Sequence, residues 1–99
     1  MSDRLLDPAV VASKGMLHWF EVIQTELSSA ELKHPDFPRD IIHQVAIMCE
    51  EAGESLRAAL QCVYEGQPVE HLEKELVQTG AMVFRILKHM EEIKERLNG

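Results

Sequence analysis

Residues 38–68 read P-R-D-I-I-H-Q-V-A-I-M-C-E-E-A-G-E-S-L-R-A-A-L-Q-C-V-Y-E-G-Q-P, and this stretch decides the fold. Its apolar residues recur every three or four positions, which is the period of one face of an α-helix. The spacing predicts a helix that begins near Pro38 and runs to about Tyr64. Gly66 suits a left-handed C-terminal cap, so we expect the helix to end within residues 65–68. The apolar set of this helix is Ile41, Val45, Met48, Ala52, Leu56, Ala59 and Val63.

The same spacing predicts one further helix on each side of this stretch. A third helix is expected from Pro68 or Val69 to Leu97, and a first helix over residues 8–29. The segment His34-Pro35-Asp36-Phe37-Pro38 breaks the chain between the first two helices. Strand signals are almost absent. The predicted fold is therefore all-α, an antiparallel helical hairpin plus an N-terminal helix.

Composition excludes several classes of protein. The 99 residues carry a net charge of −7, which argues against a nucleic-acid partner because phosphate binding needs clustered Lys and Arg. No apolar run is long enough to cross a membrane, and the first ten residues contain no signal-peptide core. Cys49 and Cys62 lie in apolar helical context and are interpreted as reduced core residues of a cytoplasmic protein.

The third helix carries an unusually wide apolar surface. Met82 and Ile86 lie off its main stripe, and broad apolar coverage of this kind indicates contact with a second subunit. We therefore expect paired hairpins in a four-helix-bundle-type homo-oligomer, a dimer or a tetramer. The alternative is a monomer in which the first helix covers the hairpin.

Acidic residues interrupt the apolar stretches of the second and third helices. Glu51 and Glu54 lie one helical turn apart on one face, and Glu75 and Gln78 repeat this spacing on the next helix. Like charges at this spacing repel, and a divalent cation would compensate them because Mg²⁺ and Mn²⁺ prefer oxygen ligands. The alternative is a solvated helix face, since glutamate is a common helix former.

Taken together, these residues resemble a family motif. Glu50-Glu51-Ala52-Gly53-Glu54 matches E-E-x-x-E, and Glu75-Leu76-Val77-Gln78 resembles E-x-x-D. The pattern is similar to the MazG-like members of the all-α nucleoside triphosphate pyrophosphohydrolase superfamily. The resemblance covers about residues 40–90 and implies a single MazG-like helical domain over residues 1–99.

The resemblance also implies an activity. Members bind Mg²⁺ and hydrolyse a nucleoside triphosphate to the monophosphate and pyrophosphate, a house-cleaning reaction, and they assemble as dimers or tetramers. Carried over, Glu51, Glu54 and Glu75 become metal ligands, together with the position of Gln78. Glu50 matches an extra leading acid that holds or activates the attacking water, which makes it the catalytic candidate.

Gln78 departs from the family pattern, which has Asp there. Its neutral amide oxygen removes one negative charge from the site. Three interpretations stay open: Gln78 ligates the metal, it contacts the substrate, or the site is weakened.

Substrate binding calls for groups that meet phosphates and a base. Arg57 and Lys94 are candidates for the phosphates, although most such side chains are simply solvated. Trp19 can stack on a base or belong to the core. The alternative function is a non-catalytic helical oligomerisation or partner-binding module with a degenerate acidic site.

Overall fold

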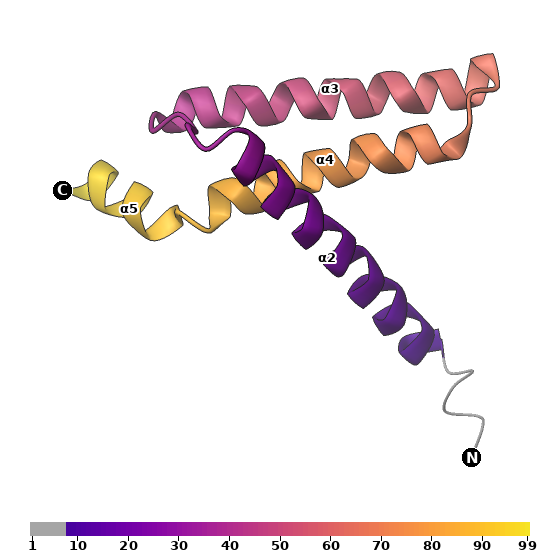
Figure 1. Cartoon of the computed structure of the whole chain (residues 1–99), viewed down its shortest axis with the longest axis horizontal. Coiled ribbons are helices and arrows are strands. Elements are labelled where there is room, and N and C mark those ends of the chain that lie inside the picture. Colours follow the sequence, from indigo (N-terminus) through magenta and orange to yellow (C-terminus); the bar gives the residue numbers. More distant parts are fainter. Residues whose placement is uncertain (1–7) are drawn as a thin grey trace.

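The computed structural model describes residues 8–99, with side chains from residue 14 onward, and no strand occurs within that range. The observed helices are α2 (Pro8–Lys33), α3 (Ile41–Glu65), α4 (Val69–Leu87) and α5 (Met90–Asn98). Figure 1 shows α3 and α4 side by side, with α2 crossing α4 obliquely and extending away from the hairpin. The predicted all-α class, with a helical hairpin and an N-terminal helix, is confirmed.

Local chemistry fixes both ends of α3. Asp40 caps its start, where the carboxylate accepts a hydrogen bond of 3.1 Å from the backbone N–H of Ile42. Helix α3 therefore begins at Ile41, slightly later than the predicted start near Pro38. At its other end Gly66 adopts φ 68° and ψ 20°, and its N–H donates to the carbonyl of Gln61. The predicted left-handed glycine cap is confirmed.

A hydroxyl contact sets the register of the antiparallel hairpin. The hydroxyl groups of Ser55 on α3 and Thr79 on α4 lie 2.9 Å apart across the interface, although 24 positions separate them in sequence. Helix α2 packs on α4 at Gly80. A Cβ at that glycine would lie 3.0 Å from the Cδ1 atom of Ile23, so the missing side chain permits the close crossing.

The predicted third helix is wrong as one continuous element. The chain turns at Lys88 and His89, where the His89 N–H donates to the carbonyl of Ile86 over a shortened turn. The turn directs α5 toward the start of α3. There Ile93 is 3% exposed, and Arg96 donates to the carbonyl of Arg39 at 2.6 Å. These contacts at the end of the hairpin compensate for the interrupted helix.

The buried face of α3 also differs from the predicted one. The buried side chains of α3 are Gln44, Ser55 and Ala58, whereas much of the predicted apolar set faces outward. Leu56 is 64% exposed and Val63 is 73% exposed. A stripe of apolar residues on α3 is consequently left uncovered within the described chain.

Two further sequence-based expectations meet the structure here. Cys49 is exposed on α3 and is therefore not a core residue, whereas Cys62 is half-buried; both are free thiols. Within residues 8–99, every helix is too short or too polar to cross a membrane.

Candidate metal centre and adjoining cavity

Three carboxylates from two helices meet at the hairpin interface. Glu51 and Glu54 project from consecutive turns of α3, and Glu75 projects from α4. One carboxylate oxygen from each residue lies within 4.8 Å of the others. Glu51 and Glu75 are half-buried, and Glu54 is exposed. Glu51 and Glu54 are separated from the Gly66 turn by more residues than Glu75 is. The three carboxylates still meet, because a glutamate side chain is long enough to span about one helical turn.

The three carboxylates repel one another. Burial raises the pKa of Glu51 above its ordinary value, and the charges of Glu54 and Glu75 raise it further, followed by those of Glu50 and Glu26. The Oε2 atoms of Glu51 and Glu75 are buried and lack a hydrogen-bond partner among the described residues. Buried acceptors without donors are unfavourable, and a cation between them would satisfy both.

The donor set fits a hard divalent cation. Carboxylate oxygens are the ligands that Mg²⁺ prefers, and few protein ligands are typical because Mg²⁺ keeps several waters. Acidic clusters also occur on helices without any ion, so the cluster alone does not identify a metal. What distinguishes this one is the pair of buried, unpartnered oxygens on opposite helices.

A cavity of about 440 Å³ adjoins Glu51. This volume lies in the range of small-molecule sites. Its walls come from α2, the following loop, α3 and α4. The lining residues are Glu26, Ser29, Ala30, Lys33, His34, Asp36, Phe37, Pro38, Ile47, Glu51, Gln78, Met82 and Arg85. Lys33 and Arg85 bring positive charge to the same space as the Glu51 carboxylate.

The other predicted site residues are divided between this cavity and other surfaces. Gln78 lines the cavity together with Glu51. Glu50 is exposed and lies outside the three-carboxylate group, although its charge acts on Glu51. Its position is that of a neighbour of the cluster and not a member of it.

The three predicted substrate-binding residues do not line this cavity in the single chain. Arg57 is exposed on α3. Trp19 is 40% exposed and borders a separate hollow with Leu76 and Val77, so it is not a core residue. Lys94 lies on α5, where its ammonium group contacts Glu91 at 3.4 Å.

Sequence reasoning missed the contribution of α2. Glu26, Ser29 and Lys33 line the cavity from one face of that helix, at spacings of three and four residues. This polar face was a detectable signal. The surface toward which this face points could not be predicted, because the motif residues on α3 and α4 do not specify where α2 crosses the hairpin.

Comparison of the chain with models of known protein families, with curated proteins and with solved structures finds no significant match.

Proposed function

We propose that the protein is a Mg²⁺-dependent nucleoside triphosphate pyrophosphohydrolase of the MazG-like type, which releases a nucleoside monophosphate and pyrophosphate. The observation that carries the proposal is the meeting of Glu51, Glu54 and Glu75 beside a cavity of about 440 Å³. Mn²⁺ is a chemically equivalent cofactor because it favours the same oxygen ligands.

The arrangement suits hydrolysis of a phosphoric anhydride. An acidic pocket repels a triphosphate, so a bound Mg²⁺ would neutralise phosphate oxygens and lower the pKa of an attacking water. Glu51, Glu54 and Glu75 would hold the ion, and Gln78 would offer a neutral amide oxygen to the ion or to the substrate. Lys33 and Arg85, which line the same cavity, would attract the phosphates.

The proposed step is a single displacement at phosphorus. A water oxygen forms a bond to the α-phosphorus, the bond to the bridging oxygen breaks, and pyrophosphate leaves. Glu50 is the proposed acceptor of the water proton, which requires its exposed side chain to turn toward the bound substrate.

Pyrophosphate release from a panel of nucleoside and deoxynucleoside triphosphates, with and without Mg²⁺, tests the activity. We expect Glu51→Gln to abolish release and Glu50→Gln to slow it by about 100-fold or more. Glu73→Gln is the matched control, because Glu73 is an exposed acid on α4 outside the cluster. Loss of activity in this control equal to that of Glu51→Gln would count against the assignment.

Metal binding has an independent readout in thermal stability. Millimolar Mg²⁺ or Mn²⁺ should raise the melting temperature, because an ion that binds only the folded chain stabilises it. When the free metal concentration is ten times the dissociation constant, the free energy of unfolding rises by about 1.4 kcal/mol. The gain should disappear in Glu51→Gln, and an unchanged melting temperature of the unmodified protein would contradict the metal site.

We also propose that the protein acts as a homo-oligomer. Uncovered apolar residues on α3, and others on α2 and α4, support contact with a second copy in a four-helix-bundle-type assembly. We place the activity in the cytoplasm, where thiols such as those of Cys49 and Cys62 stay reduced.

The second candidate is a non-catalytic oligomerisation or partner-binding module, which the same uncovered apolar residues favour. Absence of pyrophosphate release on every nucleotide, from a protein that is folded and oligomeric, would support this alternative.

A further inference from the structure

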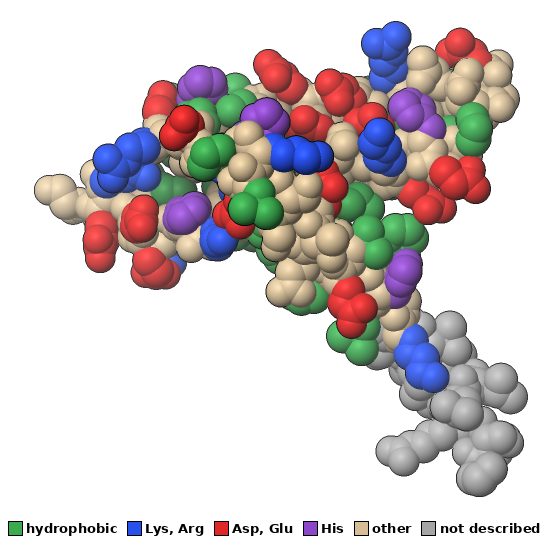
Figure 2. All heavy atoms as spheres, in the orientation of Figure 1, with side chains coloured by type: hydrophobic (Ala, Val, Ile, Leu, Met, Phe, Trp, Pro, Cys, Tyr) green, Lys and Arg blue, Asp and Glu red, His purple; other side chains and the backbone are tan. Residues whose placement is uncertain are grey.

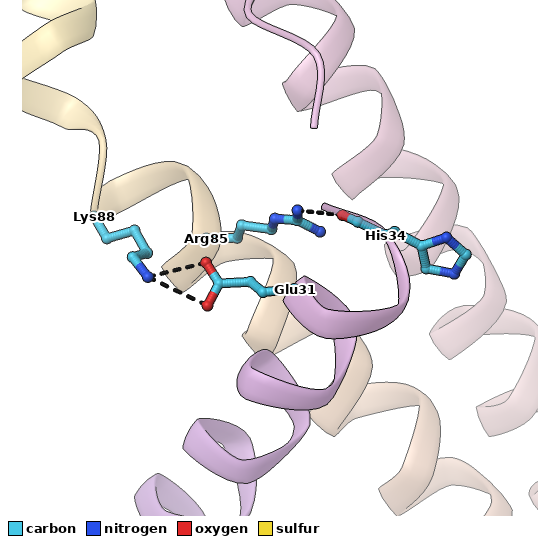
Figure 3. A network of polar contacts seen from close by, with 4 residues as sticks. All are labelled: Glu31, His34, Arg85 and Lys88. Carbon is cyan, nitrogen blue, oxygen red and sulfur yellow. Dashed lines mark hydrogen bonds and ion pairs between the residues drawn. The ribbon is translucent and has the colours of Figure 1, made fainter. Parts of the chain in front are cut away.

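Arg85 is a buried arginine without an acidic partner. It is 5% exposed on α4, it donates a hydrogen bond of 2.5 Å to the carbonyl of His34, and its guanidinium lies 4.4 Å from the ring centroid of Phe37. Figure 3 shows that Glu31, the nearby acid, pairs instead with Lys88 at 2.9 Å. A buried charge is unfavourable unless an opposite charge or a full set of hydrogen bonds compensates it.

The other arginines on this side of the molecule also lack an acidic partner among residues 14–99. Among residues 14–99, the ion pairs join Lys88 to Glu31 and Lys94 to Glu91, and none includes an arginine. A guanidinium carries five N–H donors. Arg85 and Arg96 each donate to one backbone carbonyl, so most of their donors remain for other partners.

These arginines line a second cavity of about 320 Å³, bounded by the loop after α2, the end of α4 and helix α5. Arg39, Arg85, Arg96 and His89 border it. Figure 2 shows basic and acidic side chains side by side at this end of the molecule, close to α5. Of the two acids on its wall, Glu31 is already paired with Lys88, and Glu92 is exposed. Three guanidinium groups against two carboxylates leave the wall of this cavity with a small excess of positive charge, in a chain whose net charge is −7.

We propose that this second cavity is an anion site that binds a phosphate group of a small molecule. Guanidinium groups bind phosphate oxygens through two parallel hydrogen bonds, and three of them line this cavity. The site uses none of the three clustered carboxylates and needs no metal, and Arg85 is the residue that it shares with the phosphate-attracting groups of the proposed hydrolase. Arg85 and Phe37 border both cavities, so the two cavities are neighbours.

Calorimetric titration of the full chain in EDTA, at constant ionic strength, tests the site. The probes are inorganic phosphate, pyrophosphate and a nucleoside monophosphate, which distinguish a free phosphate ion from the phosphate of an ester. We expect saturable binding of at least one probe. Arg39→Gln and Arg96→Gln should each weaken it about tenfold, which corresponds to about 1.4 kcal/mol. Both side chains are exposed, and circular dichroism checks that the variants fold. Arg96 also holds α5 through the carbonyl of Arg39, so Arg39→Gln is the variant free of a structural role.

Matched variants separate the site from general electrostatics and from a structural role of Arg85. Lys94→Gln removes an equal charge from α5 outside the cavity and should bind as the unmodified protein does. Glu51→Gln should also bind normally, because this site does not use the metal ligands. Arg85→Lys keeps the charge and loses the two-pronged geometry, so its affinity should fall while its fold is retained. Equal weakening in Lys94→Gln, unaltered affinity in both exposed arginine variants, or no saturable binding would overturn the proposal.

Discussion

The Glu51 carboxyl group links the candidate site to the stability of the hairpin. Burial raises its pKa above the ordinary value of 4.5, and the neighbouring carboxylates of Glu54 and Glu75 raise it further. On raising the pH, the unfolded chain loses the Glu51 proton first. The folded chain then holds more protons between the two pKa values, so the free energy of unfolding decreases across that window and stays lower above it.

The variant Glu51→Gln tests this charge repulsion. In EDTA at pH 7 we expect its free energy of unfolding to exceed that of the unmodified protein by about 0.5 kcal/mol, because the repulsion of Glu51 by Glu54 and Glu75 is removed. The difference should shrink as the pH falls through the raised pKa and vanish below 4.5, where the carboxyl is protonated in both states. Urea unfolding at several pH values measures it. A variant that is less stable at neutral pH without metal would contradict the repulsion, and Glu73→Gln serves as the control.

At the scale of the helices, two glycines of α3 and its cap should respond oppositely to alanine. Gly66 has a positive φ of 68°, which costs an L-residue about 1 kcal/mol, so Gly66→Ala should destabilise the hairpin by this amount. Gly53 lies inside α3 with open space around its Cα, so Gly53→Ala should stabilise the isolated chain by about 1 kcal/mol. Urea unfolding of the two variants provides the comparison. A loss of stability in Gly53→Ala would show that a ligand or a second subunit approaches that position closely.

The hairpin itself was predictable because its signals are local. Gly66 between two apolar-periodic segments predicts a cap and a turn, and Pro35 with Pro38 predicts the break before α3. The end of the predicted third helix was not predictable in this way. The turn at residues 88–89 depends on where Ile93 is buried and on the Arg96 contact with the backbone of Arg39, and both are tertiary contacts.

In the candidate site, too, the features set by local spacing were predictable and those set by tertiary contacts were not. The convergence of Glu51, Glu54 and Glu75 follows from helical spacing and an antiparallel hairpin, so the sequence alone was enough to suggest it. Glu26 and Lys33 line the cavity only because α2 crosses α4 at Gly80. A glycine permits such a crossing, but its presence in one sequence does not predict that a helix crosses there. Residues proposed for substrate binding by charge or aromaticity alone, such as Lys94, lie elsewhere for the same reason.

In the molecule as a whole, few apolar side chains are buried and many large ones are exposed. The buried apolar side chains among residues 14–99 are Ala58, Ala81, Ile86 and Ile93. Large apolar side chains remain uncovered along α3, including Ile42, Val45, Leu56, Leu60 and Val63, and on α2 and α4, including Phe20 and Phe84. The face of α3 toward α4 carries Gln44, Glu51 and Ser55 instead. The polar inner face suits an ion site, and the apolar outer stripe suits a protein partner of like surface.

A second copy of the chain explains the α3 stripe most simply, because paired antiparallel hairpins complete a four-helix bundle. A stable interface buries about 800 Å² on each partner and concentrates its binding energy in a few central apolar side chains. We therefore expect Leu56→Asp to dissociate the oligomer into monomers in sedimentation equilibrium. Leu56 is 64% exposed in the single chain, so the charge should leave the fold of the monomer intact.

Two further variants separate the possible assemblies. Phe20 contacts Phe84 edge-to-face at 5.9 Å and is 50% exposed on the other side of the hairpin, so Phe20→Asp should reduce a tetramer to a dimer and leave a dimer unchanged. Thr25→Asp, a charge placed at an exposed polar site of α2, should leave the mass unaltered. A monomeric mass for the unmodified protein would refute the oligomer. If Leu56→Asp leaves the mass of the oligomer unchanged, the interface does not lie on α3 and is assigned to the surface around Phe20.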